Sequence, residues 1–242
     1  MPRFLLPPAD WNAPQPALTG DEARHLAQVL RIRAGQQITV FDGAGRRAPA
    51  AVLDVARDHV SLALGAAESP AAPLPRITLA QAIPKGKTMD SLVRKAVELG
   101  VAAIDPLVTR NTIVQPGDRK AGKWQRTALE ACKQCGQDTL PAIAEPTPFA
   151  TWLAALPAIP APGELRIIAS LAPGARPLRE ILPRHPGTTA ATLLIGPEGD
   201  FSSEETTAAL AAGFLPATLG HIVLRVETAA TFCLSALRYQ FG

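Results

Sequence analysis

Several features that would place this 242-residue sequence in a specialised class of protein are missing. Cysteines number only three, an odd count that builds no disulfide framework and indicates a reducing compartment. No apolar run reaches the roughly 18 residues that a membrane span needs, and the N-terminus lacks the long apolar stretch of a secretory signal. The composition, 47% hydrophobic and 19% charged, excludes a disordered chain. We expect a soluble, cytoplasmic, globular protein that makes no contact with membranes.

The net charge is a modest +3, with an isoelectric point near 9.0, and it is unevenly distributed. Residues 1–70 hold equal numbers of acidic and basic side chains, so the excess lies in residues 71–242. Two stretches there, 84–95 and 110–133, are mainly basic. They could contact phosphates, although a solvated helix face is the simpler interpretation on charge alone.

A proline-rich segment, Ser69–Pro75, divides the sequence into two parts that differ in their pattern of apolar residues. In the first part, short apolar runs alternate with turn signals, and Asp42-Gly43 fits a hairpin turn. Thr19–Glu22 has the spacing of a helix capping box, and His25–Leu30 continues that helix. The predicted strands are Arg3–Leu6, Gln37–Phe41, Ala50–Val55 and Val60–Leu64. We expect residues 1–70 to form a compact, mainly β domain, a small barrel.

In residues 76–242, buried strands alternate with helices, which predicts an α/β domain with a mostly parallel sheet. The strand candidates are Ile77–Ala82, Ile104–Val108, Arg166–Ser170 and Thr192–Ile195. Apolar residues at helical spacing predict helices around Met89–Ala96, closed by Gly100, and around Trp124–Cys135. Two further helices are expected, one capped by Ser202–Glu205 and one over Glu227–Gln240, whereas Leu156–Gly163 is typical of a loop.

The cysteines and histidines suggest no metal or redox chemistry. Cys132 and Cys135 fall within a predicted helix, on the face that carries Trp124, whereas a redox pair would lie at a helix N-terminus. A zinc site needs further ligands at a matching spacing, and Cys233 with four scattered histidines provides none. We interpret these cysteines as core residues and expect no bound metal.

Two C-terminal loops are the best candidates for a functional site. Gly196–Phe201 follows a buried strand directly, where ligands bind in open α/β sheets and where glycines let the backbone approach a ligand closely. The second loop, Leu219–Ala230, carries Arg225 and Glu227 at the start of an Ala-rich helix, whose free N–H groups can bind an acceptor. Taken singly, a tight turn and an ordinary ion pair explain the two loops equally well.

The two loops also belong to an ordered series of motifs that runs through most of the chain. The earlier members are Pro2–Phe4, His25–Arg31, Phe41–Gly43, Gln81–Lys87, Met89-Asp90, Lys95–Val101, Pro106–Arg110, Trp124, Glu130-Ala131 and Gln134–Gly136. In this order, the set resembles the RsmE family of 16S ribosomal RNA (uracil-N3)-methyltransferases, which belong to the SPOUT class.

The resemblance implies a fold and an activity that composition and spacing alone do not. Residues 1–70 would form a PUA-like, RNA-binding β-barrel, and residues 76–242 a SPOUT α/β methyltransferase domain with a C-terminal trefoil knot. The protein would be a homodimer that uses S-adenosylmethionine. It would methylate N3 of a specific uridine near the 3′ end of 16S rRNA in the small ribosomal subunit.

The resemblance also implies roles for particular residues. For the chemistry itself, our own hypothesis assigns Arg225 to stabilising the negative charge that develops on the uracil, and Glu227 to accepting its proton, orienting Arg225 or capping the last helix. The expected cofactor-binding residues are Leu171, Ile195, Gly196, Pro197, Glu198, Gly199, Leu219, Gly220, Ile222, Leu224, Thr228 and Ala229. The expected RNA-binding residues are Arg3, Arg24, Arg31, Lys85, Arg94 and Arg110.

Three residues depart from the family pattern. Asp200 stands where the family usually has a glycine, and Gln137 and Ile222 stand where it usually has arginines. Two alternatives therefore stay open. One is a non-catalytic RNA-binding or ribosome-assembly protein whose pocket is spoiled by Asp200. The other is a nucleotide-binding enzyme that uses the Gly196–Gly199 turn for phosphate, although the chain lacks a phosphate-loop signature.

Overall fold

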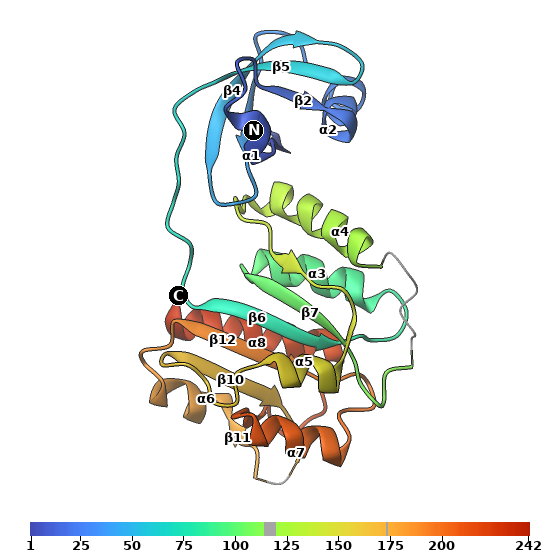
Figure 1. The fold of residues 1–242 in the computed structure, drawn as a ribbon, viewed down its shortest axis with the longest axis vertical. Coiled ribbons are helices and arrows are strands. Elements are labelled where there is room, and N and C mark those ends of the chain that lie inside the picture. The colour runs from blue at the N-terminus through green and yellow to red at the C-terminus, as the bar shows by residue number, and fades with distance from the viewer. Residues whose placement is uncertain (114–119, 173) are drawn as a thin grey trace. The chain divides into compact units, whose positions relative to one another are not determined.

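The computed structural model describes residues 1–242 apart from 114–119 and 173. The chain divides into two compact units, drawn in Figure 1. The N-terminal unit comprises Met1–Ala72 together with Leu129–Leu140, and the C-terminal unit comprises Pro73–Ala128 together with Pro141–Gly242.

The N-terminal unit is built on one five-stranded sheet that curls into a partial barrel (Figure 1). Its strands lie in the order β1-β3-β4-β5-β2, with β1 parallel to β3 and all other pairs antiparallel. The strands are β1 (Arg3–Leu5), β2 (Ala17–Thr19), β3 (Gln37–Phe41), β4 (Arg47–Val55) and β5 (His59–Leu64). Alternate residues point inward, and Ile38, Val40 and Val52 are almost fully buried in the core that the barrel encloses. The predicted mainly β unit is confirmed.

Two local predictions in this unit have different outcomes. After β3, the Asp42 carboxylate accepts hydrogen bonds from the N–H groups of Ala44 and Arg46, so the predicted turn is confirmed. The predicted capping box at Thr19 is wrong, because the Thr19 side chain makes no capping hydrogen bond. Glu22 instead accepts from the Leu5 N–H and pairs with Lys133. The helix is short, α2 (Gly20–Arg24), and continues as a π-helix over His25–Val29.

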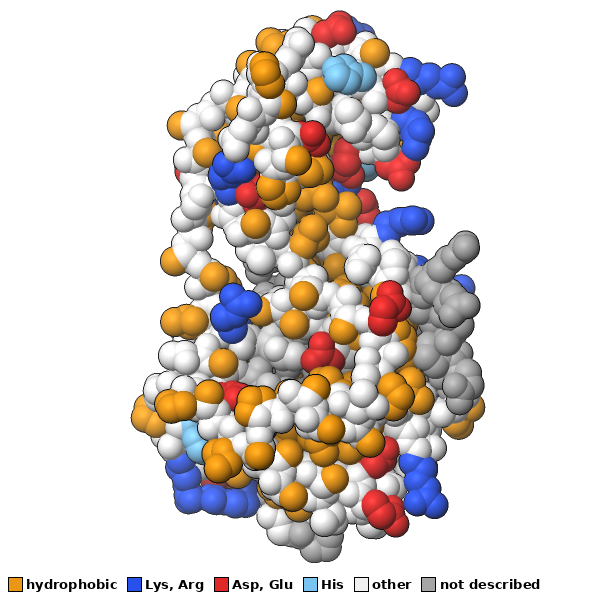
Figure 2. All heavy atoms as spheres, viewed as in Figure 1, with side chains coloured by type: hydrophobic (Ala, Val, Ile, Leu, Met, Phe, Trp, Pro, Cys, Tyr) orange, Lys and Arg blue, Asp and Glu red, His pale blue; other side chains and the backbone are white. Residues whose placement is uncertain are grey.

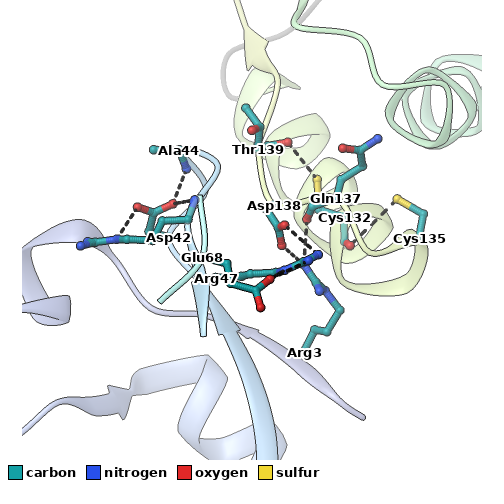
Figure 3. A network of polar contacts seen from close by, with 11 residues as sticks. Arg3, Asp42, Ala44, Arg47, Glu68, Cys132, Cys135, Gln137, Asp138 and Thr139 are labelled. Carbon is teal, nitrogen blue, oxygen red and sulfur yellow. Dashed lines mark hydrogen bonds and ion pairs between the residues drawn. The ribbon is translucent and has the colours of Figure 1, made fainter. Parts of the chain in front are cut away.

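The segment Leu129–Leu140 joins the N-terminal unit through ion pairs and a β-bridge (Figure 3). Asp138, whose side chain is 11% exposed, pairs with Arg3 and with Arg47, and Thr139 bridges Gly43. The Arg47 guanidinium also forms an ion pair with the Glu68 carboxylate, at 2.9 Å. These ion pairs hold a segment from the middle of the sequence against β1 and β4.

The C-terminal unit contains an eight-stranded sheet in which every pair of strands is parallel. Its order is β11-β13-β10-β12-β6-β7-β8, and β9 pairs with β7. The strands are β6 (Arg76–Ala82), β7 (Ala103–Val108), β8 (Ala142–Ile143), β9 (Thr147–Pro148), β10 (Glu164–Ala169), β11 (Arg176–Pro177), β12 (Ala190–Ile195) and β13 (Leu215–Thr218). The predicted α/β unit with a mostly parallel sheet is confirmed.

Helices bury both faces of this sheet. The helices of this unit are α3 (Thr88–Glu98), α4 (Lys120–Cys135), α5 (Phe149–Ala155), α6 (Leu178–Ile181), α7 (Ser203–Ala211) and α8 (Val226–Phe241). The N-terminal unit has a separate short helix, α1 (Pro8–Trp11). Ala80, Ile168 and Leu194 pack against α5 and α7, while Leu79 and Leu193, one residue earlier on their strands, are fully buried as well. The alternation of buried strands and helices in the sequence follows from this layered packing.

The predicted helices are present, with one correction. The apolar face of α3 is buried and Gly100 ends the helix at φ +70°, while Ser202 and Glu205 form the expected capping box on α7. Cys132 is fully buried, but Cys135 is exposed, because it is the last residue of α4. The prediction that Cys135 is a core residue is therefore wrong.

A buried arginine in β10 connects the sheet to the segments around it. Arg166, whose side chain is 0% exposed, donates to the carbonyl oxygens of Pro157 and Ala212 at 2.8 Å each. Its guanidinium pairs with Glu164 at 2.7 Å and lies 6.0 Å from the ring centroid of Phe214. Removal of one partner from such a group leaves polar atoms buried without compensation.

We expect Arg166→Met to destabilise the C-terminal unit by about 3 kcal/mol, because it leaves two buried carbonyls and a carboxylate without their donor. Urea-induced unfolding followed by circular dichroism measures this change. The matched control is Arg176→Met, which removes an arginine from an exposed pair with Glu180 and should cost about 0.5 kcal/mol or less. Equal losses in the two variants would contradict a special role for Arg166.

A pH dependence follows from the same pair. Burial opposes ionisation of Glu164, but the hydrogen bonds from Arg166 and from the Ala161 N–H outweigh it and hold the pKa of the Glu164 carboxyl below its ordinary value of 4.5. The pair therefore adds stability above about pH 4.5, and that contribution disappears as the pH falls through the lower folded pKa. We expect Glu164→Gln to be less stable than the wild type at pH 7. Their unfolding midpoints should converge in acid, and a gap that widened there would refute this assignment.

Candidate functional site

The C-terminal unit contains a cavity of about 500 Å³ at the carboxyl edge of its parallel sheet. The ends of β10, β12 and β13 form three of its sides, and the first residues of α3 and α8 complete it. The lining residues are Thr88, Ala169, Ser170, Leu171, Ile195, Gly196, Pro197, Glu198, Asp200, Leu219, Gly220, Ile222, Val223, Leu224, Arg225, Val226, Glu227 and Ala229. Its position is the one where open α/β sheets bind ligands, and its size suits a small molecule.

One wall of the pocket is the turn that follows β12. Gly196 lies so close to the next residues that a Cβ there would be 3.0 Å from Asp200 Oδ1 and 3.2 Å from the Phe201 ring. Asp200 has a φ of +57°, which is uncommon outside glycine, and its carboxylate accepts the Phe201 N–H at 2.8 Å. This turn is therefore tightly packed and strained.

Loops from the neighbouring strands fix this turn from outside. The Asn111 side-chain amide, after β7, donates to the carbonyl oxygens of Gly199 and Asp200 at 2.9 and 3.0 Å. The Lys85 N–H, after β6, donates to the Glu198 carboxylate at 3.0 Å. A Cβ on Gly199 would lie 3.1 Å from the Cβ of Asn111, so the close fit of Asn111 depends on that glycine.

The opposite wall is the segment between β13 and α8. Gly220, at φ +127°, permits the turn, and Ile222 and Val223 are 61% and 76% exposed at the rim. Arg225 is the N-cap residue of α8, and Glu227 lies in its first turn. Among the described residues, no hydrogen bond or ion pair engages either of these two side chains. Both are therefore available to a ligand in the pocket.

The ionisable side chains of the lining are mostly acidic. Glu198, Asp200 and Glu227 contribute three carboxylates, and Arg225 is the only basic residue in the lining as far as the chain is described. An excess of negative charge in a partly enclosed pocket favours a cationic ligand over an anionic one.

The structure gives no support to thiol chemistry. Burial raises the pKa of the Cys132 and Cys233 thiols to about 12, so both stay protonated near neutral pH. Within the described ranges, no group of three or more His, Cys, Asp or Glu side chains could hold a metal ion. The same residues include no helix that is both long and apolar enough to cross a membrane.

Most of the residues that the sequence assigns to cofactor binding and catalysis converge on this one cavity. Gly199 and Thr228 are the exceptions, since they lie beside lining residues without lining the pocket themselves. The residues that the sequence analysis missed are Thr88, Ala169, Ser170, Val223 and Val226. Their only signal was position, at the ends of predicted strands or the starts of helices.

The residues assigned to RNA binding are spread over both units. Arg24, Arg31, Lys85, Arg94 and Arg110 are exposed, and Arg31 has an unusual φ of +51°. Arg3 differs, because its side chain is 14% exposed and its guanidinium is neutralised by Asp138 and bonded to the Gln137 carbonyl. It has little capacity left for a phosphate. In the basic stretch 110–133, residues 114–119 and the Lys120 side chain lie outside the described residues. On the face in Figure 2, basic and acidic side chains are interspersed.

Two family models match the chain. Residues 70–238 match an RNA methyltransferase domain, and residues 18–64 match an RNA methyltransferase PUA domain.

Named relatives and solved structures agree with this match. The chain is 32% identical over 220 residues to ribosomal RNA small subunit methyltransferase E of Synechocystis sp., covering 91% of this chain and 71% of that protein. It is 27% identical over 244 residues to the protein of the same name from Bacillus subtilis, covering 95% and 91%. The structure of ribosomal RNA small subunit methyltransferase E from Neisseria gonorrhoeae, bound to S-adenosylmethionine, superposes with a TM-score of 0.87 at 30% identity, covering 100% and 98%. The structure of a putative methyltransferase from Legionella pneumophila in complex with the same cofactor superposes with a TM-score of 0.85 at 32% identity. The match covers 98% of this chain and 96% of that one.

We expect Gly199→Ala to lower the melting temperature by a few degrees, because the added methyl displaces Asn111 from the turn at a cost of about 1 kcal/mol. Differential scanning calorimetry measures the change. Gly122→Ala is the matched control, since it lies in α4 with no atom within 4 Å of the added Cβ and improves helix propensity. A melting temperature for Gly199→Ala at or above that of Gly122→Ala would disprove the tight fit of Asn111.

Proposed function

Since the chain belongs to the RNA methyltransferase family that its residues 70–238 match, we propose that it methylates N3 of a uridine near the 3′ end of 16S rRNA. The methyl donor is S-adenosylmethionine, the cofactor bound in the two structural relatives described above. One observation carries the proposal. Arg225 and Glu227, which have no side-chain partner among the described residues, lie in the wall of a cavity of suitable size at the carboxyl edge of the sheet.

The pocket fits the chemical groups of S-adenosylmethionine. Ile195, Leu219 and Leu224 offer apolar surface to the adenine, and the strand-end backbone offers hydrogen bonds to its edge. The carboxylates of the lining suit a ligand that carries a sulfonium and an ammonium group. When bound, this cofactor would supply an electrophilic methyl group for transfer to the acceptor.

The chain's own residues act on the acceptor, because uridine N3 carries a proton and is a poor nucleophile at neutral pH. Arg225 stabilises the negative charge that develops on a uracil oxygen as this proton leaves. Glu227, two residues further along the first turn of α8, accepts the proton or orients Arg225. The rigid start of α8 keeps both groups oriented, so that little reorganisation is needed during the reaction.

The proposal includes a homodimer and a trefoil knot, as the family resemblance implies. One face of α8 supports the dimer, because Thr228, Phe232, Ser235 and Tyr239 follow one another at helical spacing and are exposed. Phe232 is 48% exposed and Tyr239 93% exposed, which is unusual for large aromatic side chains on a C-terminal helix that otherwise buries its apolar residues.

RNA binding is proposed for the N-terminal unit and for the rim of the pocket. The partial barrel matches the PUA model and carries Arg24 and Arg31 on its surface. Lys85 and Arg110 follow β6 and β7, whose carboxyl ends lie at the same edge of the sheet as the pocket. Arginine and lysine at these positions can neutralise phosphates on either side of the target base.

Neither alternative function is favoured by the geometry. Asp200 lies in the pocket wall and leaves a cavity of about 500 Å³, so it does not fill the site. A phosphate at the Gly196 turn would face the carboxylates of Glu198 and Asp200, which argues against a nucleotide triphosphate.

We expect Arg225→Ala to reduce the rate of methyl transfer by about a hundredfold or more, because it removes the charge that stabilises the developing anion. Its affinity for S-adenosylmethionine should change by less than about threefold, since binding relies mainly on other groups. Transfer of a radiolabelled methyl group to small ribosomal subunits and isothermal titration calorimetry measure the two quantities.

The control for this experiment is Arg179→Ala, which removes an exposed arginine of α6 outside the pocket and should alter neither quantity. If Arg225→Ala lost affinity and rate in equal measure, Arg225 would be a cofactor-binding or structural residue instead.

A further inference from the structure

Asp200 has a strained backbone and a side chain that is fixed by a hydrogen bond. Its φ of +57° lies in the left-handed region, which most L-residues avoid. Two hydrogen bonds compensate for this strain. The Asn111 amide holds the Asp200 carbonyl at 3.0 Å, and the Phe201 N–H holds the Asp200 carboxylate at 2.8 Å. The carboxylate is therefore fixed in place before any ligand arrives.

The fixed carboxylate lies in the pocket wall and not at the outer surface. Asp200 lines the cavity, and its Oδ1 would be 3.0 Å from a Cβ on Gly196, which lines the cavity too. Arg225, the basic residue of the described lining, does not pair with this carboxylate, because Asp200 forms no ion pair among the described residues. Glu198 also lines the pocket without an ion pair among the described residues, and its carboxylate accepts the Lys85 backbone N–H. Asp200 thus contributes a negative charge that pairs with no cation in the part of the chain that the structure describes.

We propose that Asp200 is a specificity-determining residue that makes the pocket prefer the methyl donor, with its sulfonium charge, over the product of transfer, which has lost that charge. This inference rests on the proposed function. In the reaction, the carbon–sulfur bond breaks, the sulfur keeps the bonding electron pair, and a new carbon–nitrogen bond forms at N3. The N3 proton leaves to a base. The sulfonium thereby becomes a neutral thioether, and S-adenosylhomocysteine is the product.

The change of charge gives Asp200 its effect. The ammonium and the carboxylate of the amino-acid moiety are present in donor and product alike, so their contributions cancel in the comparison. Only the sulfonium differs, and a nearby fixed carboxylate stabilises it by Coulomb attraction that ends when the methyl group has left. The pocket therefore prefers the donor over the product more strongly than an otherwise identical neutral pocket would.

The test compares affinities for S-adenosylmethionine and S-adenosylhomocysteine by isothermal titration calorimetry on the full-length protein. Asp200→Asn is the informative variant, because asparagine tolerates the left-handed conformation and its side-chain oxygen can still accept the Phe201 N–H. We expect this variant to bind the donor about fivefold more weakly and to bind the product within about twofold of the wild type. The wild-type preference for the donor should also shrink as salt is added, because counterions screen the carboxylate.

Glu204→Gln is the matched control. It removes the same charge from the start of α7, but Glu204 is 76% exposed, pairs with Arg110 and does not line the pocket. Its preference for donor over product should equal that of the wild type. Melting temperatures of both variants establish that they are folded.

Each other result would overturn the inference. If Asp200→Asn weakened donor and product equally, Asp200 would shape the pocket without distinguishing charge. If Asp200→Asn changed neither affinity, or if Glu204→Gln weakened donor binding as much, the Asp200 carboxylate would not determine the preference for the donor. A wild-type protein that bound neither molecule would refute the proposed function itself, which separates that failure from failure of the inference.

Discussion

The parallel pairing of β12 with β6 on one side and β10 on the other is the constraint on which the site depends. Leu193 of β12 is aligned with Leu79 of β6 and with Ile167 of β10, and all three are buried. Because the strands run in one direction, their carboxyl ends meet at one edge, and segments more than a hundred residues apart in the sequence form one pocket. A slip of one residue in β12 would move its buried side chains to the opposite face and carry the Gly196 turn with them.

The turn after β12 shows how this framework and local chemistry cooperate. The sheet determines where the turn begins, and Asn111 from the loop after β7 determines its shape by holding two of its carbonyls. Opposite, Arg225 caps the N-terminus of α8 and Glu227 lies in its first turn, where buried residues such as Val226 and Ala230 hold the helix in place. A rigid scaffold with unpaired charged groups at its edge is a suitable arrangement for chemistry that depends on electrostatic stabilisation.

Much of this arrangement is predictable from the sequence, for physical reasons. The strands β6, β7, β10 and β12 are rich in buried apolar residues, because helices cover both faces of the sheet, and the capping box of α7 is a local signal. The remainder depends on contacts between distant segments. The predicted capping box at Thr19 does not form, because the Glu22 carboxylate binds the Leu5 N–H and Lys133 instead. Strand β13 is not predicted, because it is short and contains a proline. Likewise, Thr88 and Ser170 join the pocket only through the topology of the sheet.

In the function proposed above, this pocket, with Arg225 and Glu227 in its wall, methylates a uridine of small-subunit ribosomal RNA. The most direct measurement incubates the purified protein with S-adenosylmethionine and small ribosomal subunits that lack the modification, then digests the RNA and analyses its nucleosides by mass spectrometry. We expect N3-methyluridine in the complete reaction and none when the protein is omitted. Cofactor binding without any methylated nucleoside, or a methyl group on another base, would contradict it.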